Sequence, residues 1–176
     1  MKLRHTLLAI ILCGTSAVGY PQITSADNSV HPGSPPSVKI TISTSATQFK
    51  LGEPVRLEIS LTNISGKEIF VGRSVSANDI DDYDLFVVDN HGKSAPTTAS
   101  YRFFKGKRQP GDPMFYSTYS RGILLVSPGQ SVKNGIDVGK AYKIGQPGVY
   151  KIWVERLDQT RNQRVRSNII TVTVTP

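Results

Sequence analysis

The sequence predicts an all-β protein, built as an antiparallel β-sandwich of about seven to eight strands with one long insertion. The clearest observation is the alternation of two sets of residues over 150–155, which recurs with the same period of two over 169–174. The connection between these stretches is polar, so they are predicted to form a closing β-hairpin. Elsewhere, short apolar stretches are separated by Gly, Pro and Asn, and no stretch has a convincing helical period.

The other strands show the same alternation. Residues 55–62 place four aliphatic side chains on one face, and 63–67 contains the Asn and Gly that suit tight bends, so the next strand is expected to return beside 55–62 as a hairpin. A Pro-Gly turn is expected at 127–130. In chain order, the predicted strands are 38–43, 55–62, 68–71, 83–89, 123–126, 131–138, 147–156 and 166–175.

The N-terminal 36 residues are predicted to lie outside the sandwich. Residues 1–19 have the parts of a secretion signal, namely Lys2 and Arg4, an apolar run too short to span a bilayer, and small residues before the expected cleavage point. We therefore expect export to the periplasm or the extracellular space, with no transmembrane segment in the mature chain. An uncleaved N-terminal anchor is the alternative.

The mature chain is expected to hold a flexible linker and one domain. Residues 20–36 are rich in Pro, Ser and Gly without an apolar period, which is typical of a linker. Residues 37–176 are long enough for one domain with a substantial core. Within this domain, residues 94–122 form the insertion.

Composition excludes several kinds of site. Cys13 lies in the predicted signal, so the mature protein would have no disulfide, thiolate metal site or cysteine nucleophile. The folded region has a single histidine, His91, in a tight turn, which leaves serine catalysis without a base. We expect no enzyme activity and no cofactor. The net charge of +8 falls to +6 when Lys2 and Arg4 leave, which favours an acidic partner or serves only solubility. Because an exported protein has little use for nucleic acid, the partner is expected to be a protein or a cell-surface polymer.

Several segments resemble a known family. Residues 57–63 (Leu-Glu-Ile-Ser-Leu-Thr-Asn), 82–93 with its Asp-Asn-His-Gly-Lys end, the Pro-Gly turn at 128–129 and Pro147-Gly-Val-Tyr150 together resemble bacterial immunoglobulin-like domains of the BsuPI proteinase-inhibitor type. The resemblance implies an immunoglobulin-like β-sandwich in which Tyr150 forms a tyrosine corner. It departs from antibody domains at Ile152, where they have a cysteine, and in having Trp153 as its only tryptophan. The shared motifs belong to the scaffold, and no inhibitory loop can be matched.

An acidic run lies between two of the predicted strands. Its carboxylates are the hard oxygen ligands that calcium prefers, although the glycine and terminal glutamate of an EF-hand loop are missing. The alternative is a solvated turn whose aspartates cap the next strand. The weak calcium candidates are Asp79, Asp81, Asp82 and Asp84.

The insertion interleaves aromatic and basic side chains, which is typical of binding loops. Trp153 lies on the strand face that Lys151 and Glu155 make polar, where a tryptophan usually needs a cover. The insertion is therefore either a structural cover over the sheet or a binding element. The candidate binding surface comprises Trp153, Tyr101, Arg102, Phe103, Phe104, Phe115 and Tyr116.

These observations favour a non-enzymatic, exported binding or interaction module. One alternative is a proteinase inhibitor that acts through an exposed loop. The other is a carbohydrate-binding module that stacks sugars on its aromatic rings.

Overall fold

The computed structural model describes residues 35–74, 79–115 and 120–176. The predicted secretion signal, all but the last two residues of the predicted linker, and Tyr116 lie outside these ranges. Within them, none of the helices has the length and apolar character needed to cross a membrane.

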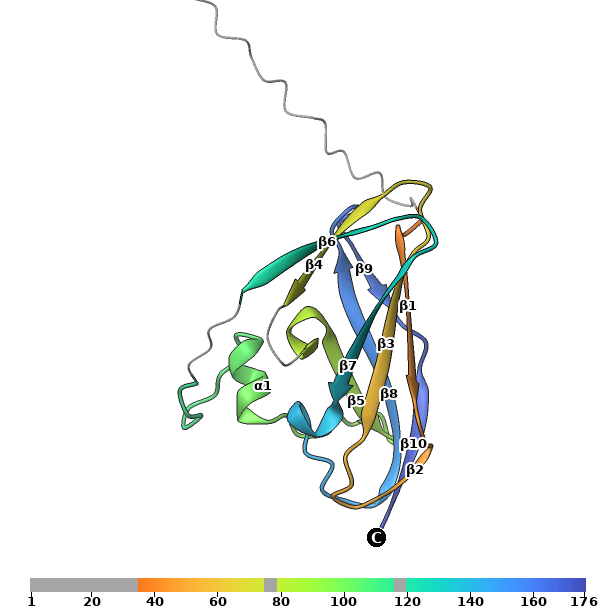
Figure 1. The fold of residues 1–176 in the computed structure, drawn as a ribbon. Coiled ribbons are helices and arrows are strands. Elements are labelled where there is room, and N and C mark those ends of the chain that lie inside the picture. Colours follow the sequence, from red (N-terminus) through yellow and green to blue (C-terminus); the bar gives the residue numbers. More distant parts are fainter. Residues whose placement is uncertain (1–34, 75–78, 116–119) are drawn as a thin grey trace, which may run out of the picture.

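Two main sheets pack face to face, and a two-stranded ribbon closes one side (Figure 1). The first sheet has the strand order β1-β3-β7, and the second has the order β2-β10-β8-β5 with β9 added to β8. The ribbon consists of β4 and β6. The strands are β1 (Val38–Thr44), β2 (Gln48–Lys50), β3 (Arg56–Asn63), β4 (Ile69–Ser74), β5 (Asp84–Asp89), β6 (Arg121–Val126), β7 (Ser131–Asp137), β8 (Gly148–Asp158), β9 (Gln163–Arg166) and β10 (Ile170–Thr175). The predicted β-sandwich with an immunoglobulin-like arrangement is confirmed.

The core lies between the sheets and follows the predicted alternation. The inward residues of β3, from Leu57 to Leu61, are almost fully buried, and Ile152, Val154 and Val172 have no exposed surface. Apolar burial on this scale is the main stabilising term for a domain without cross-links. The period of two in the sequence therefore identified the inward faces correctly.

The closing pair follows the prediction in its antiparallel pairing, but it is not a hairpin, because β9 lies between the two strands in sequence. β8 and β10 are antiparallel, with Ile170 opposite Ile152 and Val172 opposite Tyr150. The Tyr150 hydroxyl donates to the carbonyl oxygen of Gln146 at 2.9 Å, which is the expected tyrosine corner. The intervening β9 also pairs with β8, through a turn in which Asn162 has a φ of 50°.

The predicted hairpin between β3 and β4 is wrong. Both edges of β3 are taken by β1 and β7, and β4 pairs with β6 instead. The bend at 63–67 is an arch between layers, held by the buried amide of Asn63, which donates to the carbonyl oxygens of Lys67 and Val126 at 2.8 Å each. The same turn residues serve an arch and a hairpin equally well, because both need tight bends.

Two further elements differ from the expectation. A short helix, α1 (Ala99–Phe104), lies in the insertion, and Thr98 caps it by accepting the Tyr101 amide at 3.2 Å. Six residues are too few for a helical period to show in the sequence. In addition, β2 crosses to the second sheet and pairs with β10 in parallel, so the sheets are not purely antiparallel. Two 3-10 helices, η1 (Asp79–Asp82) and η2 (Val138–Lys140), complete the fold.

Candidate binding groove

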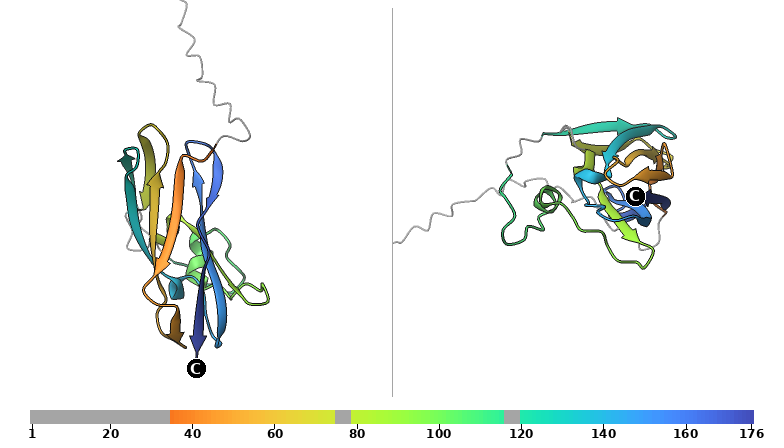
Figure 2. Two further views of the ribbon diagram at one scale, coloured as in Figure 1. Left: turned by 90° about the vertical axis from the view of Figure 1, so that its right-hand side faces the viewer. Right: turned by 90° about the horizontal axis from the view of Figure 1, so that it is seen from below.

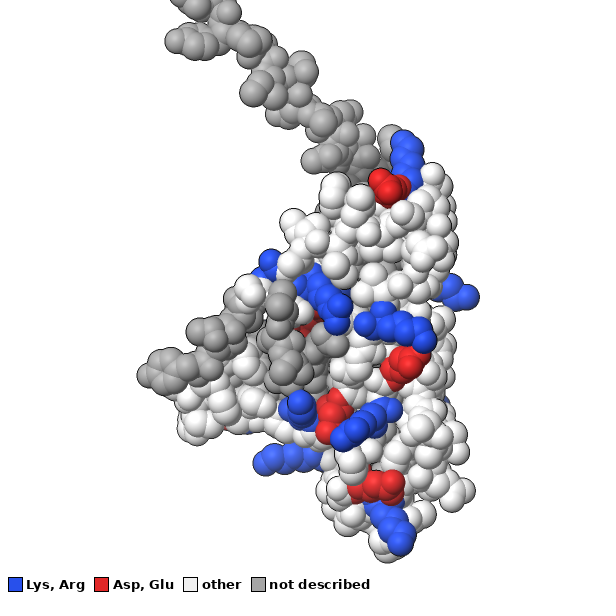
Figure 3. Space-filling model, viewed as in Figure 1, with Lys and Arg blue, Asp and Glu red and all other residues white. Residues whose placement is uncertain are grey.

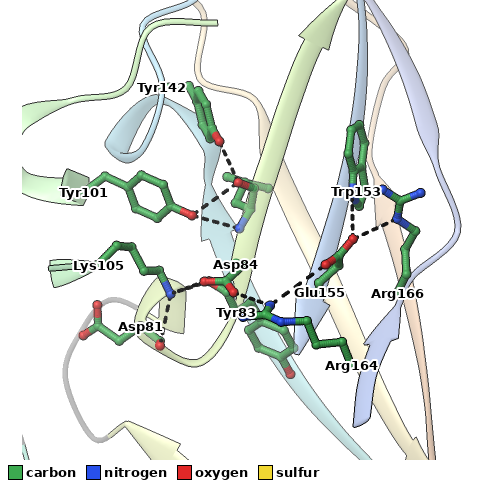
Figure 4. A network of polar contacts seen from close by, with 11 residues as sticks. Asp81, Tyr83, Asp84, Tyr101, Lys105, Tyr142, Trp153, Glu155, Arg164 and Arg166 are labelled. Carbon is green, nitrogen blue, oxygen red and sulfur yellow. Dashed lines mark hydrogen bonds and ion pairs between the residues drawn. The ribbon is translucent and has the colours of Figure 1, made fainter. Parts of the chain in front are cut away.

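Two tyrosines bind the outer edge of β5, Tyr101 from the insertion and Tyr142 from the segment after η2. The Tyr101 hydroxyl accepts the Leu85 amide at 2.9 Å and donates to the Leu85 carbonyl oxygen at 3.2 Å, and Tyr142 donates to the same carbonyl at 2.7 Å. Figure 4 shows the hydroxyl groups of Tyr101 and Tyr142 pointing at the same part of the sheet. Burial raises the pKa of Tyr101 and of Tyr142 above the usual value, so both stay protonated donors at neutral pH. Tyr101 is thus a core residue as well as part of the insertion.

Neighbouring groups continue this cover along the same edge. Lys105 donates from Nζ to the Tyr83 carbonyl oxygen at 2.7 Å, and the Ala95 amide donates to the Val87 carbonyl oxygen at 2.9 Å. Backbone groups of three alternate residues of this segment are therefore satisfied by the insertion. An edge covered in this way offers few free groups to another chain.

A groove of about 380 Å³ lies between the insertion and the outward face of β5, β8 and β9. One wall is formed by α1 and the residues just after it, including Arg102, Lys105 and Lys107, while the other wall carries Asp84, Glu155 and Arg164. Tyr101, Tyr142 and Phe86 supply the aromatic part of its surface. Of the predicted binding-surface residues, Tyr101 and Arg102 therefore line one concave surface.

Opposite charges organise the groove. Arg164 donates to Asp84 at 2.6 Å and lies 3.9 Å from Glu155, while Lys105 lies 3.3 Å from Asp84 (Figure 4). Partial burial alone would raise the pKa of Asp84, but the hydrogen bond from Arg164 and the attraction of Lys105 outweigh it and lower this pKa below its usual value. Asp84 is therefore a fixed anion that holds two cations in place.

A second ion pair braces the loop after α1. Arg102 forms a two-pronged contact with Asp112, in which Nε donates at 2.8 Å, and the Gln109 amide donates to the same carboxylate at 2.9 Å. The hydrogen bond from Arg102 and that from Gln109 lower the pKa of Asp112 to about 2. Bidentate Arg-carboxylate contacts fix geometry as well as charge, so this loop holds its shape although much of it is exposed.

Trp153 is covered by residues of its own sheet rather than by the insertion. Phe86, directly across from it on β5, stacks on the indole with ring centroids 5.1 Å apart and planes 3° apart. Arg166 on β9 lies 4.5 Å from the ring, and Glu155 accepts the indole N–H at 3.3 Å. Because β8 runs between β5 and β9, the two neighbours flank the ring from opposite sides.

The predicted surface residues divide into groups. Tyr101 and Arg102 reach the groove, and Trp153 lies beside it through Phe86 and Glu155. Half-buried Phe103, Phe104 and Phe115 instead form their own edge-to-face cluster, with centroids 5.5 and 5.6 Å apart. Tyr116 lies outside the described residues.

Several groove residues were missing from the predicted surface. Arg164 and Arg166 share the outward face of β9 and alternate with the buried Val165. The prediction had left Arg164 in a polar connection. Phe86 shares the outward face of β5 with Asp84. The signal for both was alternation on an outward strand face, but which outward faces meet depends on pairing between distant segments. The cations Lys105 and Lys107 were visible in the insertion.

Two of the four calcium candidates use their carboxylates in other contacts. Asp82 accepts the Ser74 amide at 2.8 Å, and Asp84 is held by Lys105 and Arg164. The main-chain oxygen of Asp81 accepts Lys105 at 3.3 Å. Across 35–74, 79–115 and 120–176, no three acidic, histidine or cysteine side chains gather as a metal site would require.

The groove has more positive than negative charge. Its four lining cations face two lining carboxylates, and Asp112 pairs with Arg102 from outside the groove. None of the ion pairs seen among the described residues involves the exposed Lys107. An anionic group entering here would find cations already oriented by Asp84 and Asp112. Preorganised charge of this kind favours binding because little reorganisation is needed.

The sequence matches no protein-family model and no curated protein. Among solved structures, the chain is similar to β-glucosidase from Listeria innocua in complex with gluconolactone, with 12% identity, a TM-score of 0.41 and coverage of 84% of this chain but 17% of that one. It is also similar to the CARDB domain of a Pyrococcus furiosus protein in complex with di-metal ions, with 13% identity, a TM-score of 0.38 and coverage of 80% and 89%. A β-glucosidase from Erythrobacter marinus gives 12% identity, a TM-score of 0.38 and coverage of 80% and 16%. The chain thus spans about a sixth of the length of these glucosidases, and likeness at this level carries no inference about activity.

Proposed function

We propose that this protein is an exported, non-enzymatic binding module that takes an acidic segment of a partner into the groove between the insertion and the outward face of β5, β8 and β9. The observation that carries the proposal is the excess of oriented cations around a concave, partly aromatic surface. The N-terminal Lys2 and Arg4, followed by a short apolar run, support export.

The groove would recognise carboxylates in two ways. Lys107 is exposed and none of the described ion pairs uses its ammonium group, and the exposed side chain of Arg164 lies between two carboxylates. Cations at the rim raise the association rate and make it depend on salt, while the tyrosines and Phe86 supply contact area. Affinity should therefore fall as the salt concentration rises.

A titration with poly-L-glutamate, followed by Trp153 fluorescence, tests the proposal. The variant Lys107→Glu should weaken binding by about fivefold to tenfold, because it reverses an exposed charge at the groove. Lys39→Glu is the matched control, since Lys39 is exposed on β1 in the other sheet, and it should bind as the parent protein does. An equal loss of affinity for poly-L-glutamate in both variants, or no binding at low salt, would contradict the proposed site.

One observation favours proteinase inhibition as a second candidate. The exposed loop after α1 is braced by the Arg102–Asp112 pair, and a rigid, exposed loop suits insertion into a protease cleft. A panel of proteases assayed with stoichiometric protein tests this. The candidate requires that Asp112→Asn, which loosens the loop, lose the inhibition of at least one protease that the parent protein inhibits.

The carbohydrate-binding alternative has less support. Phe86 and Arg166 flank the indole of Trp153 from both sides, so a sugar would have to displace one of them before stacking. A flat Trp153 fluorescence titration with neutral polysaccharides is the expected result.

A further inference from the structure

The β4–β6 ribbon carries an apolar outward face. Its inward residues, such as Val71 and Val126, pack on the core, but Phe70, Ile123 and Leu125 are 68%, 72% and 55% exposed. Phe70 lies directly opposite Leu125 in the register. In Figure 3, the surface in the upper part of the molecule is largely white between a few charged side chains at the tip and more of them lower down.

One edge of β6 has no strand beside it among the described residues. β6 pairs only with β4, and the described backbone hydrogen bonds include none from another segment to its second edge. The views in Figure 2 show β6 along the outside of the molecule. Its sequence, Arg-Gly-Ile-Leu-Leu-Val, has no Pro and no Lys, and the strand carries no charge after Arg121. Most of its length therefore lacks the usual protections of an edge strand.

We propose that this edge pairs with β6 of a second copy of the chain in an antiparallel, two-fold arrangement, which joins the two ribbons into a four-stranded sheet. A two-fold axis requires that the same surface be complementary to itself. β6 meets this requirement because an antiparallel copy keeps the apolar outward residues of both strands on one face when the register is even.

Charge selects the register. Pairing Leu124 with Leu124 of the second copy places Ile123 opposite Leu125 and Arg121 opposite Ser127. The Ser127 hydroxyl donates to Glu68 at 3.2 Å within its own chain, so Arg121 of one copy arrives beside Glu68 of the other. Shifting by two residues would instead set Arg121 against an apolar Leu125.

The positive charge at one end of the ribbon and the negative charge at the other are therefore brought together between two copies. Within one copy they are too far apart to form an ion pair. Arg121 lies opposite Ser74, whereas Glu68 precedes Ile69 at the other end. Six strand residues separate these ends by roughly 20 Å. The pairing of two short strands buries less than a standard interface, so we expect a dissociation constant on the order of 10–100 µM.

Sedimentation velocity of the mature chain, from about 5 to 500 µM, tests the pairing. The parent protein should convert from monomer to dimer over this range. Ile123→Lys should raise the dissociation constant at least tenfold, because it puts a charge at the centre of the shared face. Phe70→Lys is the matched control: it is equally exposed, but on β4, away from the paired edge, and should change the constant by less than about twofold.

A charge exchange provides a second, independent readout. Arg121→Glu should weaken the dimer, and the double variant Arg121→Glu with Glu68→Arg should restore it, because the two groups meet only between copies. A parent protein that stays monomeric overturns the proposal, as does a dimer that survives Ile123→Lys. Loss of the dimer in Phe70→Lys would show that the apolar faces pack on each other, or on another partner, instead of the strands pairing edge to edge. If the double variant dimerises as weakly as Arg121→Glu alone, the proposed register is excluded.

Discussion

The outer edge of β5 is covered by other parts of the chain, whereas the outer edge of β6 has no neighbouring strand among the described residues. On β5, Leu85 has its amide and carbonyl groups bound by the Tyr101 hydroxyl, and the carbonyl also accepts Tyr142. On β6, no described segment pairs with the second edge, and Ile123 and Leu125 are exposed beside it. Both strands are short and rich in aliphatic residues, so strand composition does not explain the difference.

The difference arises from the segments that follow or precede each strand in the chain. The insertion after β5 returns to the same edge through Ser94, which bridges Val88, and then through α1. Closing the edge also creates the groove, because the covering segment stands clear of the outward sheet face. Covering the edge of β5 thus creates a binding groove within one chain, while the uncovered edge of β6 leaves backbone groups that a strand of another chain can pair with.

The largest expected effect comes from removing the cover of β5. Tyr101→Ala deletes a buried ring together with both contacts to Leu85, and large-to-small core changes of this kind cost about 3–5 kcal/mol. Urea unfolding followed by Trp153 fluorescence measures the free energy of unfolding. Phe104→Ala, in the same helix but half-buried, should cost about 1 kcal/mol. Equal costs for both would mean that the edge contacts of Tyr101 are unimportant.

A smaller change isolates the hydroxyl. Tyr101→Phe leaves the Leu85 amide without its acceptor, which should cost about 1–2 kcal/mol in the same unfolding experiment. Tyr142→Phe should cost less, because the Leu85 carbonyl keeps the Tyr101 hydroxyl as donor. If Tyr142→Phe is the more harmful of the two, the cover depends on η2 and its neighbours rather than on α1.

The loop beside the covered edge should depend on pH only in strong acid. The pKa of Asp112 in the folded protein is about 2, below the ordinary value of 3.8. The stabilisation from Arg102 is therefore fully present above the ordinary value and is lost as the pH falls through about 2. NMR titration of the Asp112 carboxyl carbon should give a midpoint about 2, and a midpoint near the ordinary value would contradict the pairing. In Asp112→Asn, the Gln109 amide should lose this pH dependence.

The smallest effect is expected on the bare edge. Ile123→Lys should change the free energy of unfolding by less than about 0.5 kcal/mol when measured at low protein concentration, because the side chain is already in solvent. Thermal unfolding of the monomer measures this. A large loss would show that β6 is as well covered in solution as β5.

The sequence allowed the strands and their inward faces to be predicted, because alternation is a local property. Leu57, Ile152 and Val172 lie where the period of two put them. The tyrosine corner was also predictable, since Tyr150 and its acceptor at Gln146 are four residues apart. Partner choice was not predictable in the same way. Nothing local in residues 63–67 shows that the buried Asn63 amide will reach Val126 and turn a hairpin into an arch.

The candidate groove was predictable only in part. The basic and aromatic residues of the insertion, such as Arg102, were recognisable from composition. Their opposite wall was not, because Asp84 and Arg164 come together only when β5 and β9 pair with the two edges of β8. The partner of Trp153 was missed for the same reason. Phe86 lies opposite it in a register that connects residues far apart in the chain.

The groove and the bare edge can be separated by amide NMR during titration with poly-L-glutamate, at a protein concentration where the chain is monomeric. The proposed function predicts shifts confined to the groove, at Asp84, Phe86, Lys105, Lys107 and Arg164, with none on β6 from Arg121 to Val126. Shifts that follow β4 and β6, or that spread evenly over the basic surface, would contradict a binding site built by the covered edge.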